Sequence, residues 1–282
     1  MISLQQLQDG IVIPLDKPRQ WTSFQAVNKV KAVVRNTYGL KKFKIGHAGT
    51  LDPLATGLLL VCIGKATKTI PQLQDGDKVY TGTLVLGATT ACYDLERPVD
   101  HYYPYEHITR ELLDETVRQF TGTIQQVPPM FSAVKIDGQR AYEYARLDDP
   151  TATIQPKTVN VYSFEITAFR KPETQENPPT SPALPKAMAL STAEINQISE
   201  NLSPFTSHLY QHPLGEVPPH LPQADFRIHC GKGTYIRSLA RDLGLALGSG
   251  AFLSALRREK VGEYTINQAI NPNETQQFFE SM

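Results

Sequence analysis

Twelve residues, Gly46-His-Ala-Gly-Thr-Leu-Asp-Pro-Leu-Ala-Thr-Gly57, are the most informative stretch of this chain. Glycines at 46, 49 and 57 together with Pro53 predict an irregular, tightly turned loop in place of a helix. The apolar run Leu58-Leu-Leu-Val-Cys-Ile63 follows directly, so the loop would be presented from a rigid element. Catalytic groups tend to sit on such loops, which makes Asp52 a candidate. An Asp that only shapes the turn is the alternative.

The loop lies in a strongly basic part of a chain whose net charge is zero. Between residues 17 and 68 there are ten basic residues and one acid, Asp52, which gives +9. Residues 226 to 262 hold seven basic residues against two acids, which gives +5, so the rest of the chain carries −14. This distribution predicts a localised anion-binding face, with solvated lysines on helices as the alternative. The neighbouring cations favour an ionised Asp52, which is a competent nucleophile or base.

The bulk composition predicts a folded protein of the reduced cytosol. Of the 282 residues, 40% are hydrophobic and 20% are charged, which suits a packed core. The first residues lack the basic start and apolar stretch of a secretory signal, and no apolar run approaches the ~20 residues that cross a bilayer. Three widely spaced cysteines, Cys62, Cys92 and Cys230, fit neither a disulfide framework nor a zinc site.

Local patterns predict alternating strands and helices. Thr22-x-x-Gln25 resembles a capping box at the start of a helix from about Ser23 to Arg35. Strands are predicted at 11–15, 80–86, 159–169 and 226–230, and a helix over 113–120 that Gly122 can terminate. A further helix begins near 236, where Arg237 and Arg241 share one face. Residues from about 171 to 222 hold ten of the 21 prolines and are predicted to be a surface insertion.

The Gly46–Gly57 loop resembles the signature loop of the TruB family of tRNA pseudouridine synthases. Further blocks of resemblance occur in the family's order from residue 10 to about 170 and from 225 to 262. They are Gly10 to Thr22 with Leu15-Asp-Lys-Pro18, Asp77-Lys-Val-Tyr80 with Leu86-Gly87, Gln126 to Lys135 with Arg140 to Arg146, and Gly231 to Arg237 with Asp242-Leu-Gly244. The stretch Thr89-Thr-Ala-Cys-Tyr-Asp94 follows the family's polar segment only loosely, so it receives no role.

The resemblance implies a role for each matching position. Asp52 would be the essential carboxylate that attacks the uridine, at the sugar or at the base ring. Tyr80 would stack on the extruded base and is a candidate for removing the proton from carbon 5, while Arg237 would pair with Asp52. His47 is expected to lie against RNA bases. Other residues expected to contact RNA are Lys17, Lys65, Lys68, Lys135, Lys232 and Arg241.

The fold implied is an α/β (α+β) pseudouridine synthase fold, with a central, mostly antiparallel mixed sheet, flanking helices and a catalytic cleft. We expect one catalytic domain over 1–282, a thumb-like RNA-binding loop at about 124–152 and no C-terminal module of the PUA type. The expected substrate is the T-arm of tRNA, without cofactor, metal, membrane or obligate protein partner. A monomer in the cytoplasm is expected.

Three alternatives remain at this point. A catalytically silent tRNA-binding protein would use the same basic face but should have lost the set Asp52, Tyr80 and Arg237. An RNA-guided enzyme of the same superfamily relies on a C-terminal RNA-binding module and on protein partners. A nucleotide-dependent enzyme is suggested by Gly64-Lys-Ala-Thr67 and Gly231-Lys-Gly-Thr234, but neither completes a phosphate-binding loop motif.

Overall fold

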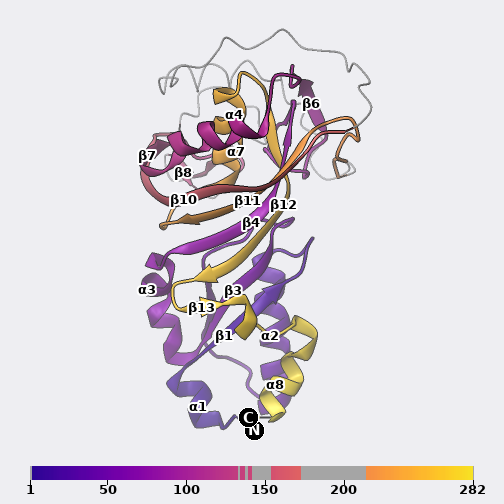
Figure 1. Cartoon of the computed structure of the whole chain (residues 1–282). Coiled ribbons are helices and arrows are strands. Elements are labelled where there is room, and N and C mark those ends of the chain that lie inside the picture. The colour runs from indigo at the N-terminus through magenta and orange to yellow at the C-terminus, as the bar shows by residue number, and fades with distance from the viewer. Residues whose placement is uncertain (1, 133, 137–138, 142–153, 173–213, 282) are drawn as a thin grey trace. The chain divides into compact units, whose positions relative to one another are not determined.

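The computed structural model describes residues 2–132, 134–136, 139–141, 154–172 and 214–281 (Figure 1). They form two compact units, each described here by itself. Unit 1 comprises Met1–Thr81 and Leu256–Met282, and unit 2 comprises Gly82–Ala255. Two strands, β4 (Lys78–Leu86) and β12 (Ala251–Val261), contribute residues to both units.

In unit 1, strand β3 (Thr56–Ile63) is the central element. It pairs antiparallel with β1 (Ile11–Lys17) on one side and with β2 (Ile45–Ala48), while β12 joins it in parallel through Arg257 and Thr56. Strand β13 (Tyr264–Thr265) continues from β12. Seven of the eight residues of β3 are buried, which explains its continuous apolar sequence.

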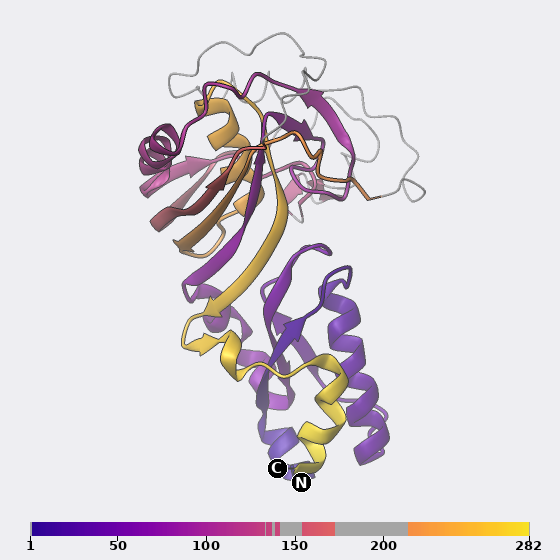
Figure 2. The ribbon, with the colours of Figure 1, turned by 45° about the vertical axis from the view of Figure 1, so that its right-hand side comes forward.

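Helix α2 (Ser23–Tyr38) confirms the predicted capping box, because Thr22 and Gln25 hydrogen-bond each other's backbone amides. Its buried side includes Val27, Val30 and Val34, as the apolar spacing predicted. The helix packs on β2 and on α8 (Thr275–Ser281) (Figure 2). The amide of Ile2 donates to the carbonyl of Phe279 at 3.2 Å, so the two ends of the described chain lie together. The remaining helices of unit 1 are α1 (Leu4–Asp9), η1 (Gly64–Thr69), α3 (Ile70–Asp75), η3 (Ile266–Gln268) and η4 (Pro272–Glu274).

In unit 2, the long strand β10 (Lys157–Arg170) pairs antiparallel with β7 (Gly122–Gln126) and with β11 (Gln223–Cys230). The strand order is β12-β4-β11-β10-β7. Two short hairpins, β5–β6 and β8–β9, stand apart from this order. Their bounds, with those of the helices, are β5 (Ala88–Thr90), β6 (Val99–Tyr102), β8 (Lys135–Ile136), β9 (Gln139–Arg140), α4 (Arg110–Thr116), η2 (Val117–Phe120) and α7 (Ile236–Ala246).

These ladders confirm the predicted fold class. The β1–β3, β2–β3, β7–β10 and β10–β11 pairs are antiparallel, and the β3–β12 pair is parallel. One local expectation changes. The helix predicted over 113–120 is α-helical only to Thr116, a 3₁₀ turn continues to Phe120, and Gly122 opens strand β7 at φ 97°. The proposed insertion falls mostly on 173–213 and much of the thumb-like loop on 142–152, outside the described residues.

All three cysteines, Cys62, Cys92 and Cys230, are buried thiols that form no disulfide in the described part of the chain. Burial raises the pKa of the Cys62 thiol to about 11. Among the described residues, no helix is long and apolar enough to cross a membrane.

Candidate active site and RNA-binding face

Asp52 lies in unit 1 on the loop between β2 and β3, half-buried. Two glycines bracket this loop, Gly49 at φ 89° and Gly57 at φ 100°. A Cβ atom on Gly57 would collide with the backbone carbonyl of Arg258. Glycine is therefore required at 57 both by its conformation and by the close approach of β12.

Three residues from the end of β1 to the start of α2, Lys17, Gln20 and Ser23, hold the loop. The buried Ser23 hydroxyl accepts from the amide of Leu51 at 2.9 Å and donates to the Leu51 carbonyl at 3.1 Å. The amide of Gln20 donates to the Pro53 carbonyl at 2.8 Å. The residues on either side of Asp52 are thus fixed by residues that are close together in the sequence.

Lys17 is the third group, and it is fully buried. Its ammonium donates to the carbonyls of Trp21 at 2.6 Å, Pro18 at 3.0 Å and Pro53 at 3.2 Å. A side chain with no exposed surface is poorly placed to reach a phosphate of RNA. This position favours a structural role for Lys17, as a hydrogen-bond donor that supports the Asp52 loop, over the expected contact with RNA.

Arg258 fixes the loop from β12. Its side chain is only 2% exposed, and it donates to the carbonyls of Gly49 at 3.0 Å and Leu58 at 2.8 Å. These carbonyls lie on the two sides of Asp52 in the sequence. Ser23 and Arg258 were not singled out from the sequence, because their partners are far away along the chain.

His47 lies on β2, directly before the loop. Burial, with a smaller effect of the Arg258 charge, lowers the pKa of this imidazole below its ordinary value. Among the described residues, its buried Nδ1 atom has no hydrogen-bond partner. The neutral form of the ring is therefore favoured.

Tyr80 lies on β4 and is 9% exposed, in unit 1 together with Asp52. The start of β4 is fixed by Lys78, whose ammonium donates to the carbonyls of Gln74 and Gly76. A salt bridge of 3.3 Å joins Lys260 of β12 to Asp77. Tyr80 therefore comes from a strand whose entry is well anchored.

Arg237 lies on α7 in unit 2 and is 5% exposed, contrary to a solvated helix charge. It donates to the carbonyls of Cys92 at 3.1 Å and Phe131 at 2.8 Å. Its Nε atom lies 3.9 Å from a carboxylate oxygen of the buried Asp94. Asp94 had received no role from the sequence, although the segment that contains it had been noted.

The turn that carries Asp94 has an unusual backbone. Tyr93 adopts φ 60°, a conformation that costs a bulky residue energy. The Thr90 hydroxyl donates to the Asp94 carbonyl at 2.7 Å, and the Cys92 thiol donates to its carboxylate at 3.0 Å. Together these contacts direct the Asp94 carboxylate toward Arg237.

Arg241, one helical turn after Arg237, is also 5% exposed. It donates to the Val127 carbonyl at 3.0 Å and to Asp242 at 2.7 Å, and its guanidinium lies 5.7 Å from the centre of the Tyr93 ring. The guanidinium donates hydrogen bonds to groups inside the protein. This position favours a structural role for Arg241 in the packing of α7 over the expected contact with RNA.

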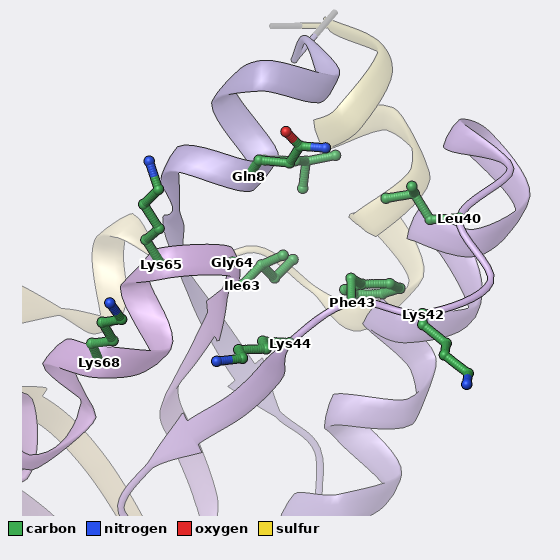
Figure 3. Close-up of a pocket in the computed structure, with 10 residues that line it drawn as sticks. Gln8, Leu40, Lys42, Phe43, Lys44, Ile63, Gly64, Lys65 and Lys68 are labelled. Carbon is green, nitrogen blue, oxygen red and sulfur yellow. The ribbon is translucent and has the colours of Figure 1, made fainter.

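Four lysines gather around one cavity of unit 1, about 370 Å³ in volume. Figure 3 shows Lys65 and Lys68 on η1 at one side, and Lys42 and Lys44 near the start of β2. Phe43 and Leu40 give the cavity an apolar part. Among the residues that the structure describes, none that lines the cavity is acidic, although Lys65 pairs with Asp9 at 2.7 Å outside the lining. The structure thus places Lys65 and Lys68 at one cavity together with Lys42 and Lys44, and their contact with RNA stays a prediction.

The two other basic residues expected to contact RNA lie in unit 2. Lys232 is exposed in the turn between β11 and α7, where the Thr234 hydroxyl donates to the Gly231 carbonyl at 3.0 Å. Lys135 lies on β8. Among the described residues, no cluster of three His, Cys, Asp or Glu side chains is arranged to hold a metal ion.

Sequence comparison relates the chain to one family at both ends. The model described as "TruB family pseudouridylate synthase (N terminal domain)" matches residues 35–180, and "tRNA pseudouridylate synthase B C-terminal domain" matches residues 237–280. A curated "tRNA pseudouridine synthase B" of Flavobacterium johnsoniae is 45% identical over 264 residues, covering 93% of each chain. The protein of the same name from Parabacteroides distasonis is 40% identical and covers 96% of this chain and 94% of its own.

Solved structures show the same fold in larger chains. A chain of the "Crystal Structure of a Cbf5-Nop10-Gar1 Complex" superposes over 98% of this chain with a TM-score of 0.59 and 25% identity. A chain of the "Structure of H/ACA RNP bound to a substrate RNA containing 2'-deoxyuridine" covers 97% with a TM-score of 0.56 and 23% identity. The present chain spans 56% and 54% of these two chains, or about half their length.

Proposed function

The chain belongs to the TruB family of tRNA pseudouridine synthases, and from this premise we propose that it isomerises the T-loop uridine of tRNA, with Asp52 as the reacting carboxylate. The uridine concerned is position 55 in tRNA numbering. The observation that best supports the role of Asp52 is the fixation of its loop. Hydrogen bonds to Gly49, Leu51, Pro53 and Leu58 hold the backbone on both sides of the carboxylate.

The reaction rearranges the nucleoside without adding or removing atoms overall. The bond from the ribose carbon 1′ to the base nitrogen 1 breaks, the base rotates, and carbon 5 joins carbon 1′ while its proton moves to solvent and nitrogen 1 gains one. Asp52 acts as nucleophile, either on the sugar or on the ring. The base must first be extruded from the folded T-loop, because its glycosidic bond is otherwise out of reach.

The other two members of the proposed set act around this carboxylate. Tyr80 stacks on the extruded base, which repays part of the cost of unstacking, and is the candidate for removing the carbon 5 proton. Arg237 pairs with Asp52 and holds it in place. The contacts of Arg237 with Asp94 and with the carbonyls of Cys92 and Phe131 support this role, since they fix the guanidinium within unit 2.

The basic residues hold the RNA. We assign phosphate contacts to Lys65, Lys68, Lys135 and Lys232, and a contact with RNA bases to His47. Lys42 and Lys44 join Lys65 and Lys68 because they line the same cavity. Phosphate contacts release condensed counterions, so binding should weaken steeply as salt is added.

The test is pseudouridine mapping of an unmodified tRNA transcript after incubation with the pure protein, wild type beside Asp52→Asn. We expect a new pseudouridine in the T-loop with the wild type alone, while Asp52→Asn keeps its melting temperature and most of its affinity for tRNA. Product formation by Asp52→Asn would remove Asp52 from the chemistry. Loss of folding in this variant would identify a structural Asp instead.

The same assay separates the rival functions. Binding of tRNA without product by the wild type would favour a silent RNA-binding protein, and product only after addition of a guide RNA would favour the RNA-guided branch. We further propose that the protein acts as a monomer in the cytoplasm without a cofactor. A single peak at the monomer mass in sedimentation, with full activity after exhaustive dialysis against a chelator, is the expected result.

A further inference from the structure

We propose that the exposed face of helix α2 binds a strand of the RNA substrate, with Phe24 stacking on an unpaired base. This inference rests on the proposed function, because it names a second contact of the same substrate. Phe24 is 70% exposed, which is more than any other large hydrophobic side chain among the described residues. A single exposed apolar residue is common on proteins, so its surroundings carry the argument.

The first observation is the connection of Phe24 to the catalytic loop. Ser23, the residue before Phe24, makes two hydrogen bonds to Leu51. Leu51 is the residue before Asp52 in the catalytic loop. Adding the covalent and hydrogen-bond lengths along this path limits the Cα separation of Phe24 and Asp52 to about 15 Å. Phe24 therefore lies close enough to Asp52 for one bound RNA strand to reach both residues.

The second observation is the composition of the helix face that begins at Phe24. The exposed positions of α2 share one arc of the helix, as the 3.6-residue period requires. They are Phe24, Gln25, Asn28, Lys29, Ala32, Arg35 and Asn36. None of the 16 residues of α2 is acidic. This face offers an aromatic surface, amides and cations, with nothing that repels a phosphate.

The third observation is that the fold does not need this ring. The core side of α2 is formed by Ala26, Val27, Val30 and Val34, and its N-terminus is capped by Thr22 and Gln25. A polar residue at position 24 would serve the helix equally well. Aromatic rings on which bases stack are typical of proteins that bind unpaired RNA, and each stacked base is worth about tenfold or more in affinity.

The chemistry of the ligand follows from these features. Phe24 recognises the flat face of a base and is indifferent to its sequence, since every base has such a face. Lys29 and Arg35 lie further along the same arc, about 8 Å and 17 Å from Phe24 at the rise of an α-helix. They face the phosphates of the strand that leaves the stacked base.

The experiment measures the dissociation constant for unmodified tRNA and the rate of pseudouridine formation for Phe24→Ser, Phe24→Trp and Leu4→Ser. Leu4 is the matched control, an exposed apolar residue of the same unit on α1 that does not line the lysine cavity. We expect Phe24→Ser to weaken tRNA binding about tenfold, Phe24→Trp to bind within about threefold of wild type, and Leu4→Ser to match wild type. All three should keep the melting temperature of the wild type.

A fluorescence readout tests stacking directly. Trp21 is the only tryptophan of the chain, so Phe24→Trp adds a single new emitter whose signal is the difference from wild type. Saturating tRNA should quench this added emission, whereas the added emission of Leu4→Trp should stay unchanged. The double change Lys29→Gln with Arg35→Gln should lower the salt slope of binding by about 2.

Outcomes that overturn the inference are distinct from those that overturn the proposed function. Wild-type affinity in Phe24→Ser, or an equal loss in Leu4→Ser, removes the stacking role while the wild type still forms pseudouridine. Absence of product with the wild type would contradict the proposed function itself.

Discussion

Around Asp52, single polar side chains replace the regular hydrogen bonding that a strand or helix would give. Lys17, Ser23 and Arg258 each satisfy backbone groups that the irregular loop leaves without strand partners. A buried carbonyl without a donor is costly, which is why such a loop needs dedicated partners. The loop's shape therefore depends on a few individual residues.

Replacing Lys17 by Met should show this dependence. Met fills a similar volume but leaves the carbonyls of Pro18 and Trp21 without this donor, so we expect a loss of about 1–3 kcal/mol in the free energy of unfolding. Turnover should fall while tRNA affinity changes little. Urea unfolding and steady-state kinetics measure both. Lys260→Met, which removes a partly exposed ion pair with Asp77, is the control and should cost less than about 1 kcal/mol. A larger loss of affinity than of turnover would restore Lys17 as an RNA contact.

His47 gives a prediction for pH. Its pKa in the folded protein lies below the ordinary value because of burial and the Arg258 charge. Between the two values the unfolded chain binds more protons, so stability is complete above about pH 6.5 and is lost as the pH falls through the folded pKa. We expect the free energy of unfolding to fall between pH 7.5 and pH 5 by less in His47→Gln than in wild type. Equal pH profiles of the two proteins in chemical denaturation would contradict this.

Sequence reasoning could name residues that stand in motifs, whose roles stay predictions, but it did not find the residues that contact the Asp52 loop only in the folded chain. Asp52, Tyr80 and Arg237 stand in recognisable motifs, so their positions could be named in advance. The partners of the loop could not, because Ser23 lies 28 residues from Leu51 and Arg258 lies 209 residues from Gly49. The contacts of Lys17 and Arg241 with RNA stay predictions, and the burial of both side chains could not be read from the sequence.

Elements with local signals were predicted well. Helix α2 was recognised because its capping box and its apolar spacing lie within the helix itself. The helix before β7 was predicted less well, since its change from α to 3₁₀ geometry after Thr116 has no comparable signal in the sequence. The pairing of β12 with β3, by contrast, depends on the whole fold.

The β2–β3 connection yields a prediction that concerns the element as a whole. Gly57→Ala would force a Cβ atom into the backbone of Arg258 at a positive φ, so we expect a loss of well over about 2 kcal/mol and loss of turnover. Gly233→Ala is the matched control, because Gly233 has φ 80° with no atom within 4 Å of the added carbon. It should cost only about 1 kcal/mol of strain. Equal melting temperatures of the two variants would show that the backbone of β12 can move away from the added carbon at little cost, and would contradict this prediction.

On the scale of the whole molecule, the net charge is zero, but the basic and acidic residues are unevenly distributed along the chain. The basic residues are concentrated in two stretches of sequence, and the four lysines of the cavity come from the first. Such a protein can bind a polyanion locally while its acidic remainder limits nonspecific adhesion. Composition alone would have argued against a nucleic-acid partner, and only the position of the charges along the chain corrected this.

Salt dependence tests this view. The double variant Lys44→Glu with Lys68→Glu should weaken tRNA binding and lower the slope of log affinity against log salt by about 2. Lys157→Glu with Lys171→Glu, at the two ends of β10 in unit 2, changes the net charge equally and should leave the slope near that of wild type. Equal slopes for both double variants would show that total charge, and not the cavity, governs binding.

The three buried cysteines also make the protein convenient for site-specific labelling. The reactive species in alkylation is the thiolate, and burial keeps the thiols of Cys62 and Cys92 protonated at neutral pH. Cys230 is equally inaccessible. A maleimide dye should therefore not react with the native protein. A cysteine introduced in place of Phe24 or Lys44 would then carry the only label. Distances from such a dye to a labelled tRNA could then be followed by energy transfer without removing any natural residue of the interior.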